Sequence, residues 1–185
     1  MTALESWQAA VMRCRTGRSR SERETWERLA RWYDCWVRHN DYVSIFMPRL
    51  LALLDHPPTS RVLEIGPGSG AFTLPLASVV KQVVAAEPSQ PMRDVLTRKC
   101  ASSGVNNVTV LPRRIEDVVE TLEGPFDLVL AAYSMYNLLS IDQVLRHLLV
   151  LSPQVVILMG DGKPMAWRQT LYRRFKGQER VASPQ

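Results

Sequence analysis

The sequence has few of the features that mark exported, membrane-spanning or metal-binding chains. Its three cysteines, Cys14, Cys35 and Cys100, are scattered, form no CxxC pair and have no histidine at ligand spacing, which argues against a disulfide framework and a zinc site. No apolar run reaches transmembrane length, and the chain does not start with a basic stretch followed by an apolar core. We therefore expect a cytoplasmic chain with no membrane partner and no metal.

The composition is that of an ordinary globular domain. The chain has 185 residues, of which 46% are hydrophobic and 22% charged, so it can bury a sizeable core but not two large domains. The net charge of +5 is divided between an Arg-rich start and an Arg-rich end. Such a mild excess permits an anionic partner without indicating one.

The most informative stretch is residues 62–74, which read VLEIGPGSGAFTL. An apolar run stops at an acid and then at three glycines on alternate positions, after which apolar residues return at helical spacing. This pattern predicts a strand, a tight loop and a helix. Glycines suit such a loop because a missing Cβ lets a ligand approach the backbone N–H groups at the start of a helix.

Two kinds of ligand fit this spacing. Gly66, Gly68 and Ala71 satisfy the dinucleotide pattern G-x-G-x-x-G/A, and Glu87 follows about 20 residues later at the end of the next apolar run. A nicotinamide or flavin nucleotide would therefore fit. Glu64 argues the other way, because its carboxylate would repel a pyrophosphate and attract an ammonium group.

With Gly70 included, the loop also reads E-x-G-x-G-x-G and resembles the first motif of class I S-adenosylmethionine-dependent methyltransferases. The cofactor of that family carries an amino group and a sulfonium but no phosphate. The resemblance extends from about Trp26 to Lys163 and implies S-adenosyl-L-methionine (SAM) as cofactor and S-adenosylhomocysteine (SAH) as product. It places Glu64, Gly66, Gly68 and Gly70 around the cofactor.

Two further cofactor contacts follow from the resemblance. Residues 83–92 resemble the second motif, in which an acid ends the second strand, so Glu87 is expected to accept hydrogen bonds from both ribose hydroxyls, with Pro88 and Met92 beside the adenine. Trp26, Ala30, Tyr33 and Asp34 look like the family's W-x3-A-x2-Y-D helix, which makes Tyr33 a candidate cap on the methionine portion. Core packing is the alternative role for Met92 and Tyr33.

The third motif departs from the family pattern. Ile115 and Glu116 match the loop that borders the adenine edge, but Arg114 stands where an acid usually accepts from the adenine amino group. Arginine has no acceptor. Either Glu116, Asp117 or a water replaces that acid, or the Ile115 backbone holds adenine alone, and we expect weaker cofactor affinity.

The fourth stretch, residues 126–138, resembles the family's fourth strand and the loop that faces the transferable methyl group. It makes Ala131 a cofactor contact and Tyr133, Tyr136 and Asn137 candidate substrate contacts, with core packing or capping as the alternative.

The loop lacks the Asn/Asp-Pro-Pro-aromatic or Asn-Leu-Pro-aromatic tetrad of adenine and cytosine N-methyltransferases. The first motif also looks like that of ribosomal RNA adenine dimethylases, and the missing tetrad favours a small-molecule acceptor over nucleic acid. His56 and His147 are available as bases, but we assign no catalytic residue.

The expected fold is α/β, a Rossmann-like doubly wound, mostly parallel sheet of about five strands in the order 3-2-1-4-5. Residues 1–57 are expected to form a helical cap, with helices over 2–12, from Ser21 and over 41–54, and residues 58–185 the SAM-binding domain. The predicted strands and helices of that domain cover 61–65, 82–86, 108–111, 127–131 and 155–158, and 91–102, 115–122, 141–150 and 164–175 respectively. Residues 13–20 are expected to be a weakly ordered link.

A fold of this family usually closes with two more strands, for which we see no signal before Gln185. The chain is therefore a minimal version, a truncated one, or one whose exposed sheet edge is covered by another subunit, as in a homodimer. The missing strands and Arg114 leave a non-catalytic SAM-binding or interaction module as an alternative to the enzyme. An NAD(P)-type oxidoreductase and, more weakly, an RNA methyltransferase are the others.

Overall fold

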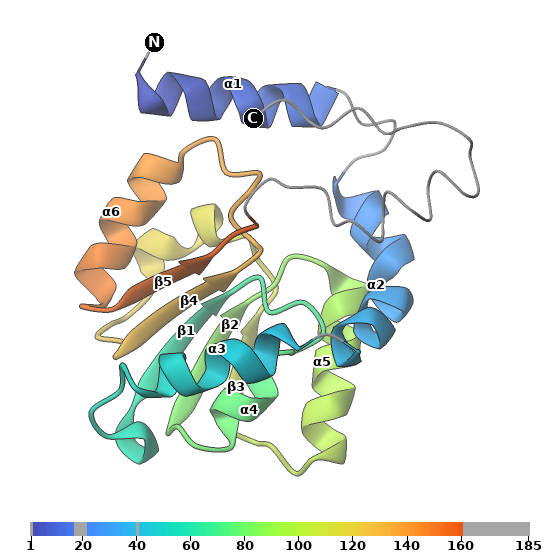
Figure 1. Cartoon of the computed structure of the whole chain (residues 1–185), viewed down its shortest axis with the longest axis vertical. Coiled ribbons are helices and arrows are strands. Elements are labelled where there is room, and N and C mark those ends of the chain that lie inside the picture. The colour runs from blue at the N-terminus through green and yellow to red at the C-terminus, as the bar shows by residue number, and fades with distance from the viewer. Residues whose placement is uncertain (1, 17–21, 40, 161–185) are drawn as a thin grey trace.

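The chain folds around a five-stranded parallel sheet (Figure 1). The computed structural model describes residues 2–16, 22–39 and 41–160. The strand order is β3-β2-β1-β4-β5 and every neighbouring pair is parallel, which confirms the predicted fold class and order. The strands are β1 (Arg61–Ile65), β2 (Gln82–Ala86), β3 (Val108–Leu111), β4 (Leu128–Ala132) and β5 (Val155–Leu158).

Helices surround the sheet and leave its carboxyl edge for the loops (Figure 1). They are α1 (Ala3–Thr16), α2 (Glu22–Arg38), α3 (Tyr42–Leu51), α4 (Thr73–Ala77), α5 (Gln90–Ser102) and α6 (Ile141–Leu151), with 3-10 turns η1 (Pro57–Thr59), η2 (Ile115–Asp117) and η3 (Val119–Thr121). In Figure 1, α1 lies above the loops that leave β4, and α2 stands beside α5.

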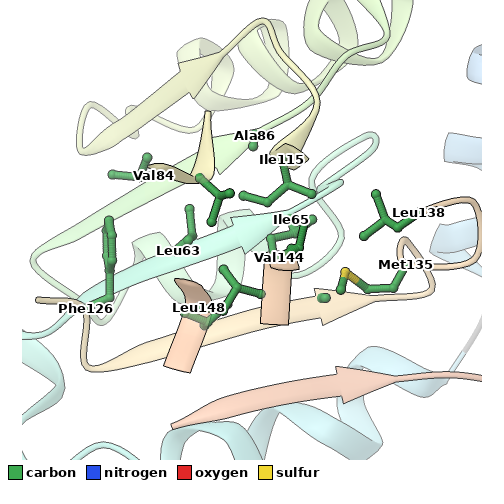
Figure 2. Packing of buried hydrophobic residues seen from close by; sticks show 13 residues of the cluster. Leu63, Ile65, Val84, Ala86, Ile115, Phe126, Met135, Leu138, Val144 and Leu148 are labelled. Carbon is green, nitrogen blue, oxygen red and sulfur yellow. The ribbon is translucent and has the colours of Figure 1, made fainter. Parts of the chain in front are cut away.

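The central strands are mostly apolar because both faces of the sheet are covered. On one face, Leu63 and Ile65 of β1 pack against Val144 and Leu148 of α6, as Figure 2 shows. On the other face, alternate residues of the same strands pack against α3 and α4, with Phe72 2% exposed at the centre. The mostly apolar runs of β1, β2 and β4, interrupted in β1 by Glu64, are thus typical of strands buried on both sides.

Several predicted boundaries differ from the structure. The helix expected over 115–122 is wrong, since this stretch forms the two separate 3-10 turns η2 and η3. Ile115 and Val119 both reach the core, but Val118 between the turns has φ −129°, which interrupts helical geometry. Residues 127–131 were placed one position early, because β4 spans Leu128–Ala132.

The N-terminal helices also differ in length. α1 continues to Thr16, so the weakly ordered link expected from residue 13 is wrong for 13–16; Arg13 and Arg15 in its last turn favour the helix because they face the negative end of its dipole. α3 ends at Leu51, three residues early, and holds Pro48 inside it. The predicted cap at Ser21, the rest of the link and the helix over 164–175 lie outside the described residues.

Candidate functional site

The glycine loop between β1 and α4 lies at the carboxyl edge of the sheet. Gly66, Gly68 and Gly70 have φ values of +64°, +57° and +86°, a backbone conformation that side chains disfavour. A Cβ on Gly66 would lie 2.5 Å from the Cβ of Ser134, and one on Gly68 would meet only the Tyr33 ring, at 3.4 Å. The loop is therefore packed on one side by the loop after β4 and covered on the other by α2.

Glu87 places its carboxylate directly on this loop. It follows β2, is 6% exposed, and accepts hydrogen bonds from the N–H of Gly68 at 2.9 Å and from that of Ser89 at 2.8 Å. The two stretches singled out in the sequence, 62–74 and 83–92, thus meet at one point.

Glu64 lies behind the glycine loop, inside the sheet. It is 2% exposed and its Oε2 accepts a hydrogen bond from the Thr73 hydroxyl at 2.6 Å. Burial raises the pKa of Glu64 to about 7, and the neighbouring charge of Glu87 adds to the rise while the bond from Thr73 opposes it. The Glu64 carboxyl group is therefore only partly ionised near neutral pH.

Helix α2 is anchored to the loop by a partly buried ion pair. Lys99 of α5 donates to Asp34 of α2 at 2.7 Å and to the carbonyl of Ser69 in the glycine loop at 2.9 Å. Burial alone would raise the pKa of Asp34, but the hydrogen bond and charge of Lys99 hold it below its ordinary value. The arrangement holds Tyr33, one residue before Asp34, over Gly68.

The residues predicted to border adenine lie in different environments. Met92 and Ile115 are 2% and 3% exposed, whereas Pro88 is exposed. Glu116 is not left alone beside the site, because its carboxylate pairs with Arg114 at 2.9 Å. The arginine that replaces the expected acid thus engages one of the two acids proposed to substitute for it.

The loop after β4 carries the candidate substrate contacts. Tyr133 has φ +55° and is 38% exposed, and Tyr136 is 37% exposed and accepts a bond from the Gly160 N–H at 2.7 Å. The carbonyl of Asn137 accepts from Arg15 of α1 at 2.7 Å. Ala131 is fully buried within β4 and packs in the core.

Sequence reasoning missed three contributors. Tyr42, the first residue of α3, contacts Phe72 and Tyr133 with ring centroids 5.5 and 5.6 Å apart. Ser134 ties the loop after β4 to β1 by donating to the Ile65 carbonyl at 2.6 Å, and Trp7 of α1 donates to the Leu138 carbonyl at 2.6 Å. The positions of these three residues depend on long-range packing. The one sequence feature that pointed to any of them is the small side chain of Ser134.

The two histidines lie away from this edge. His56 precedes β1 at the amino end of the sheet, and His147 is half-exposed on α6, 3.8 Å from Glu120. Within the described residues no group of three or more His, Cys, Asp or Glu side chains could hold a metal ion, and no helix there is long and apolar enough to cross a membrane.

A separate groove of about 770 Å³ lies between α2 and α5, lined by residues that include Arg28, Asp94 and Arg98. None of the predicted cofactor or substrate residues lines it.

Comparison with known proteins identifies the same region. A family model described as a methyltransferase domain matches residues 62–152. The mitochondrial ribosomal RNA small subunit methyltransferase of Arabidopsis thaliana is 37% identical over 78 residues, which are 42% of this chain and 20% of that protein. The first curated relatives are all rRNA methyltransferases, and this chain spans less than half of the length of each.

Two solved structures show the same fold. Magnesium protoporphyrin IX methyltransferase from Synechocystis PCC 6803, solved with bound SAM, has a TM-score of 0.55 at 21% identity over 68% of this chain and 60% of that chain. The N-terminal domain of EvdMO1, solved with bound SAH, has a TM-score of 0.50 at 26% identity over 55% of this chain and 43% of that chain.

Proposed function

We propose that residues 62–152, which match a family model described as a methyltransferase domain, are a class I SAM-dependent methyltransferase domain and that the chain uses SAM to methylate a small-molecule acceptor. One observation carries the proposal. The Glu87 carboxylate lies 2.9 Å from the N–H of Gly68, so an acceptor for ribose hydroxyls and the glycine loop share one edge of the sheet.

The residues present suit this cofactor. A Cβ at Gly66 or Gly70 would collide with Ser134 or Leu96, so the loop needs glycine at both positions, and the Glu87 carboxylate lies against this loop. Buried acids at 64 and 87 suit a ligand with an ammonium and a sulfonium, and they oppose the pyrophosphate of a dinucleotide. The Ile115 backbone remains our candidate for the adenine edge, since Glu116 is paired with Arg114.

The chain's own contribution to the reaction is binding and orientation. When bound, SAM supplies an electrophilic methyl group. Tyr133, Tyr136 and Asn137 lie in the loop after β4 at the same sheet edge and would hold the acceptor, and α2 with Tyr33 would exclude water from above. His56 and His147 both lie away from this edge, so we assign neither of them as a base.

An rRNA acceptor is the second candidate, because the first curated relatives methylate rRNA by name. We favour a small molecule because residues 126–138 lack the tetrad with which base N-methyltransferases grip an exocyclic amine.

Calorimetric titration with SAH tests the proposal. We expect micromolar binding that is lost in Glu87→Ala, because no neutral side chain there can accept from two hydroxyls. Glu120→Ala is the matched control, since that acid is 75% exposed on η3 and should leave binding unchanged. Binding of NADH in place of SAH, or SAH binding that survives Glu87→Ala, would contradict the proposed site.

A further inference from the structure

Four tyrosines from three parts of the chain meet beside the glycine loop. Tyr33 comes from α2, Tyr42 from α3, and Tyr133 and Tyr136 from the loop after β4. Trp36 links the rings of Tyr33 and Tyr42, with centroids 5.7 and 6.2 Å from theirs, and the rings of Tyr42 and Tyr133 meet edge to face with centroids 5.6 Å apart. Tyr136 follows Tyr133 by three positions in the same loop. We call these four residues the tyrosine cluster.

The tyrosine cluster exposes ring surface to solvent, and the carboxyl groups of Glu64 and Glu87 lie on its interior side. Tyr133 and Tyr136 are 38% and 37% exposed, whereas Tyr33 and Tyr42 are half-buried behind them. Glu87 acts electrostatically on Tyr33, and Glu64 on Tyr42. Lys99, which binds the same loop, is neutralised by its 2.7 Å pair with Asp34. Both the ring faces and the acids therefore make this place favourable to a positive charge.

The backbone of Tyr133 is an independent sign that its ring is needed there. Its φ of +55° is one that glycine or asparagine would adopt more easily. Two hydrogen bonds hold the strained segment, from the Tyr133 N–H to Leu158 at 2.8 Å and from the Ser134 hydroxyl to Ile65 at 2.6 Å. Strain that the surroundings maintain at a solvent-facing aromatic residue is typical of a functional position.

We propose that the tyrosine cluster binds an organic cation and that the acceptor is accordingly an amine that enters as its ammonium form. To accept the methyl group, its nitrogen would first lose a proton to solvent. The nitrogen lone pair would then form the new N–C bond as the methyl–sulfur bond of SAM breaks and SAH leaves. Aromatic faces attract ammonium groups through their quadrupole, and quaternary or protonated amines are the ligands such clusters recognise. An anionic acceptor would be repelled by Glu64 and Glu87. The role of this ligand as the methyl acceptor rests on the proposed function, whereas the binding of a cation does not.

Choline and 3,3-dimethylbutan-1-ol test the charge directly, because they differ only in the replacement of the quaternary nitrogen by carbon. We expect choline to bind the SAH-loaded chain about tenfold more tightly in calorimetric titration. Equal affinities, or no binding of choline, would overturn the proposal. The same titrations without SAH keep the proposal testable if SAH fails to bind, an outcome that would contradict the proposed function alone.

Variants at Tyr133 locate the effect. Tyr133→Phe keeps the ring and should keep the preference for choline, whereas Tyr133→Asn suits the backbone, lacks the ring and should lose most of it. Trp32→Ala is the control, since this 76% exposed aromatic on α2 lies outside the tyrosine cluster. Circular dichroism and SAH affinity establish that each variant folds. A preference for choline that survives Tyr133→Asn together with Tyr136→Leu would contradict the assignment.

The sulfonium of SAM is the other source of positive charge at this edge. Comparing the affinities of SAM and SAH in wild type and Tyr133→Asn distinguishes the sulfonium from the acceptor as the cation that the tyrosine cluster binds. A cation preference seen only between SAM and SAH, with choline and its isostere equal, would overturn the assignment to the acceptor. A choline preference that Tyr133→Asn removes while the ratio of SAM to SAH affinity stays unchanged supports it.

Discussion

At the scale of single residues, two buried carboxyl groups near the glycine loop differ in the hydrogen-bond donors that they contact. Glu87 accepts two backbone N–H bonds, which favour its charged form, whereas a single hydroxyl, that of Thr73, donates to Glu64. Because burial raises the pKa of Glu64 to about 7, the same residue type is an ionised acceptor at one position and a titrating group at the other.

Glu64→Gln should change how stability depends on pH. Between the ordinary pKa of 4.5 and the folded value of about 7, the folded chain holds a proton that the unfolded chain has released. The contribution of Glu64 to stability is therefore lost as pH rises through this window, by at most roughly 3 kcal/mol. Urea unfolding at pH 5 and pH 8 should show a smaller loss for Glu64→Gln than for wild type. Equal losses in the two proteins would contradict the buried titration.

Gly66→Ala and Gly104→Ala form a matched pair. Both glycines have positive φ, +64° and +67°, but a Cβ on Gly104 meets nothing within 4 Å, whereas one on Gly66 meets Ser134 at 2.5 Å. We expect about 1 kcal/mol of destabilisation from φ at position 104 and roughly 1–3 kcal/mol more at 66 from overpacking. Urea unfolding measures both, and similar losses would show that Ser134 moves aside freely.

At the scale of elements, prediction from the sequence succeeded for short strands and failed where long-range packing decides the structure. Four of the five strands begin and end where predicted, because a short apolar run between turn signals has few alternatives. The helix predicted over 115–122 became two 3-10 turns although its apolar spacing was helical. The docking of α1 on the loop after β4 left no local signal, since backbone carbonyls accept its side chains.

Trp7→Phe tests the docking of α1. The substitution keeps an aromatic ring but removes the indole N–H that donates to the Leu138 carbonyl. We expect a loss of about 1 kcal/mol and faster hydrogen exchange of the amides in residues 137–140. Trp32→Phe, at a 76% exposed position on α2, should leave exchange there unchanged. Unaltered exchange in Trp7→Phe would mean that α1 does not hold this loop.

At the scale of the whole molecule, the sheet gathers the sequence motifs into one edge, and this much could be predicted. Glu87 and the glycine loop were expected to meet because carboxyl ends of parallel strands share an edge, and they do. The tyrosine cluster could not be predicted, because Tyr42 and Tyr133 are 91 positions apart in the sequence. Only the position of α3 in the fold brings their rings together. Composition was equally uninformative about the acceptor, since a net charge of +5 fits either candidate.

Salt dependence separates the two acceptors. A small-molecule enzyme of this charge should bind a short RNA hairpin only non-specifically, with a Kd no tighter than about 1 μM near physiological salt and a steep loss as salt rises. Fluorescence anisotropy between 50 and 200 mM KCl measures this. Submicromolar RNA binding that persists at 200 mM KCl would favour the rRNA candidate instead.

The crystal structure of the chain with SAH tests the central claim most directly. We predict SAH at the carboxyl edge of β1 and β2, with both ribose hydroxyls within hydrogen-bond distance of the Glu87 carboxylate and the adenine beside Ile115. SAH bound in the groove between α2 and α5, or on the glycine loop without contact to Glu87, would contradict the account.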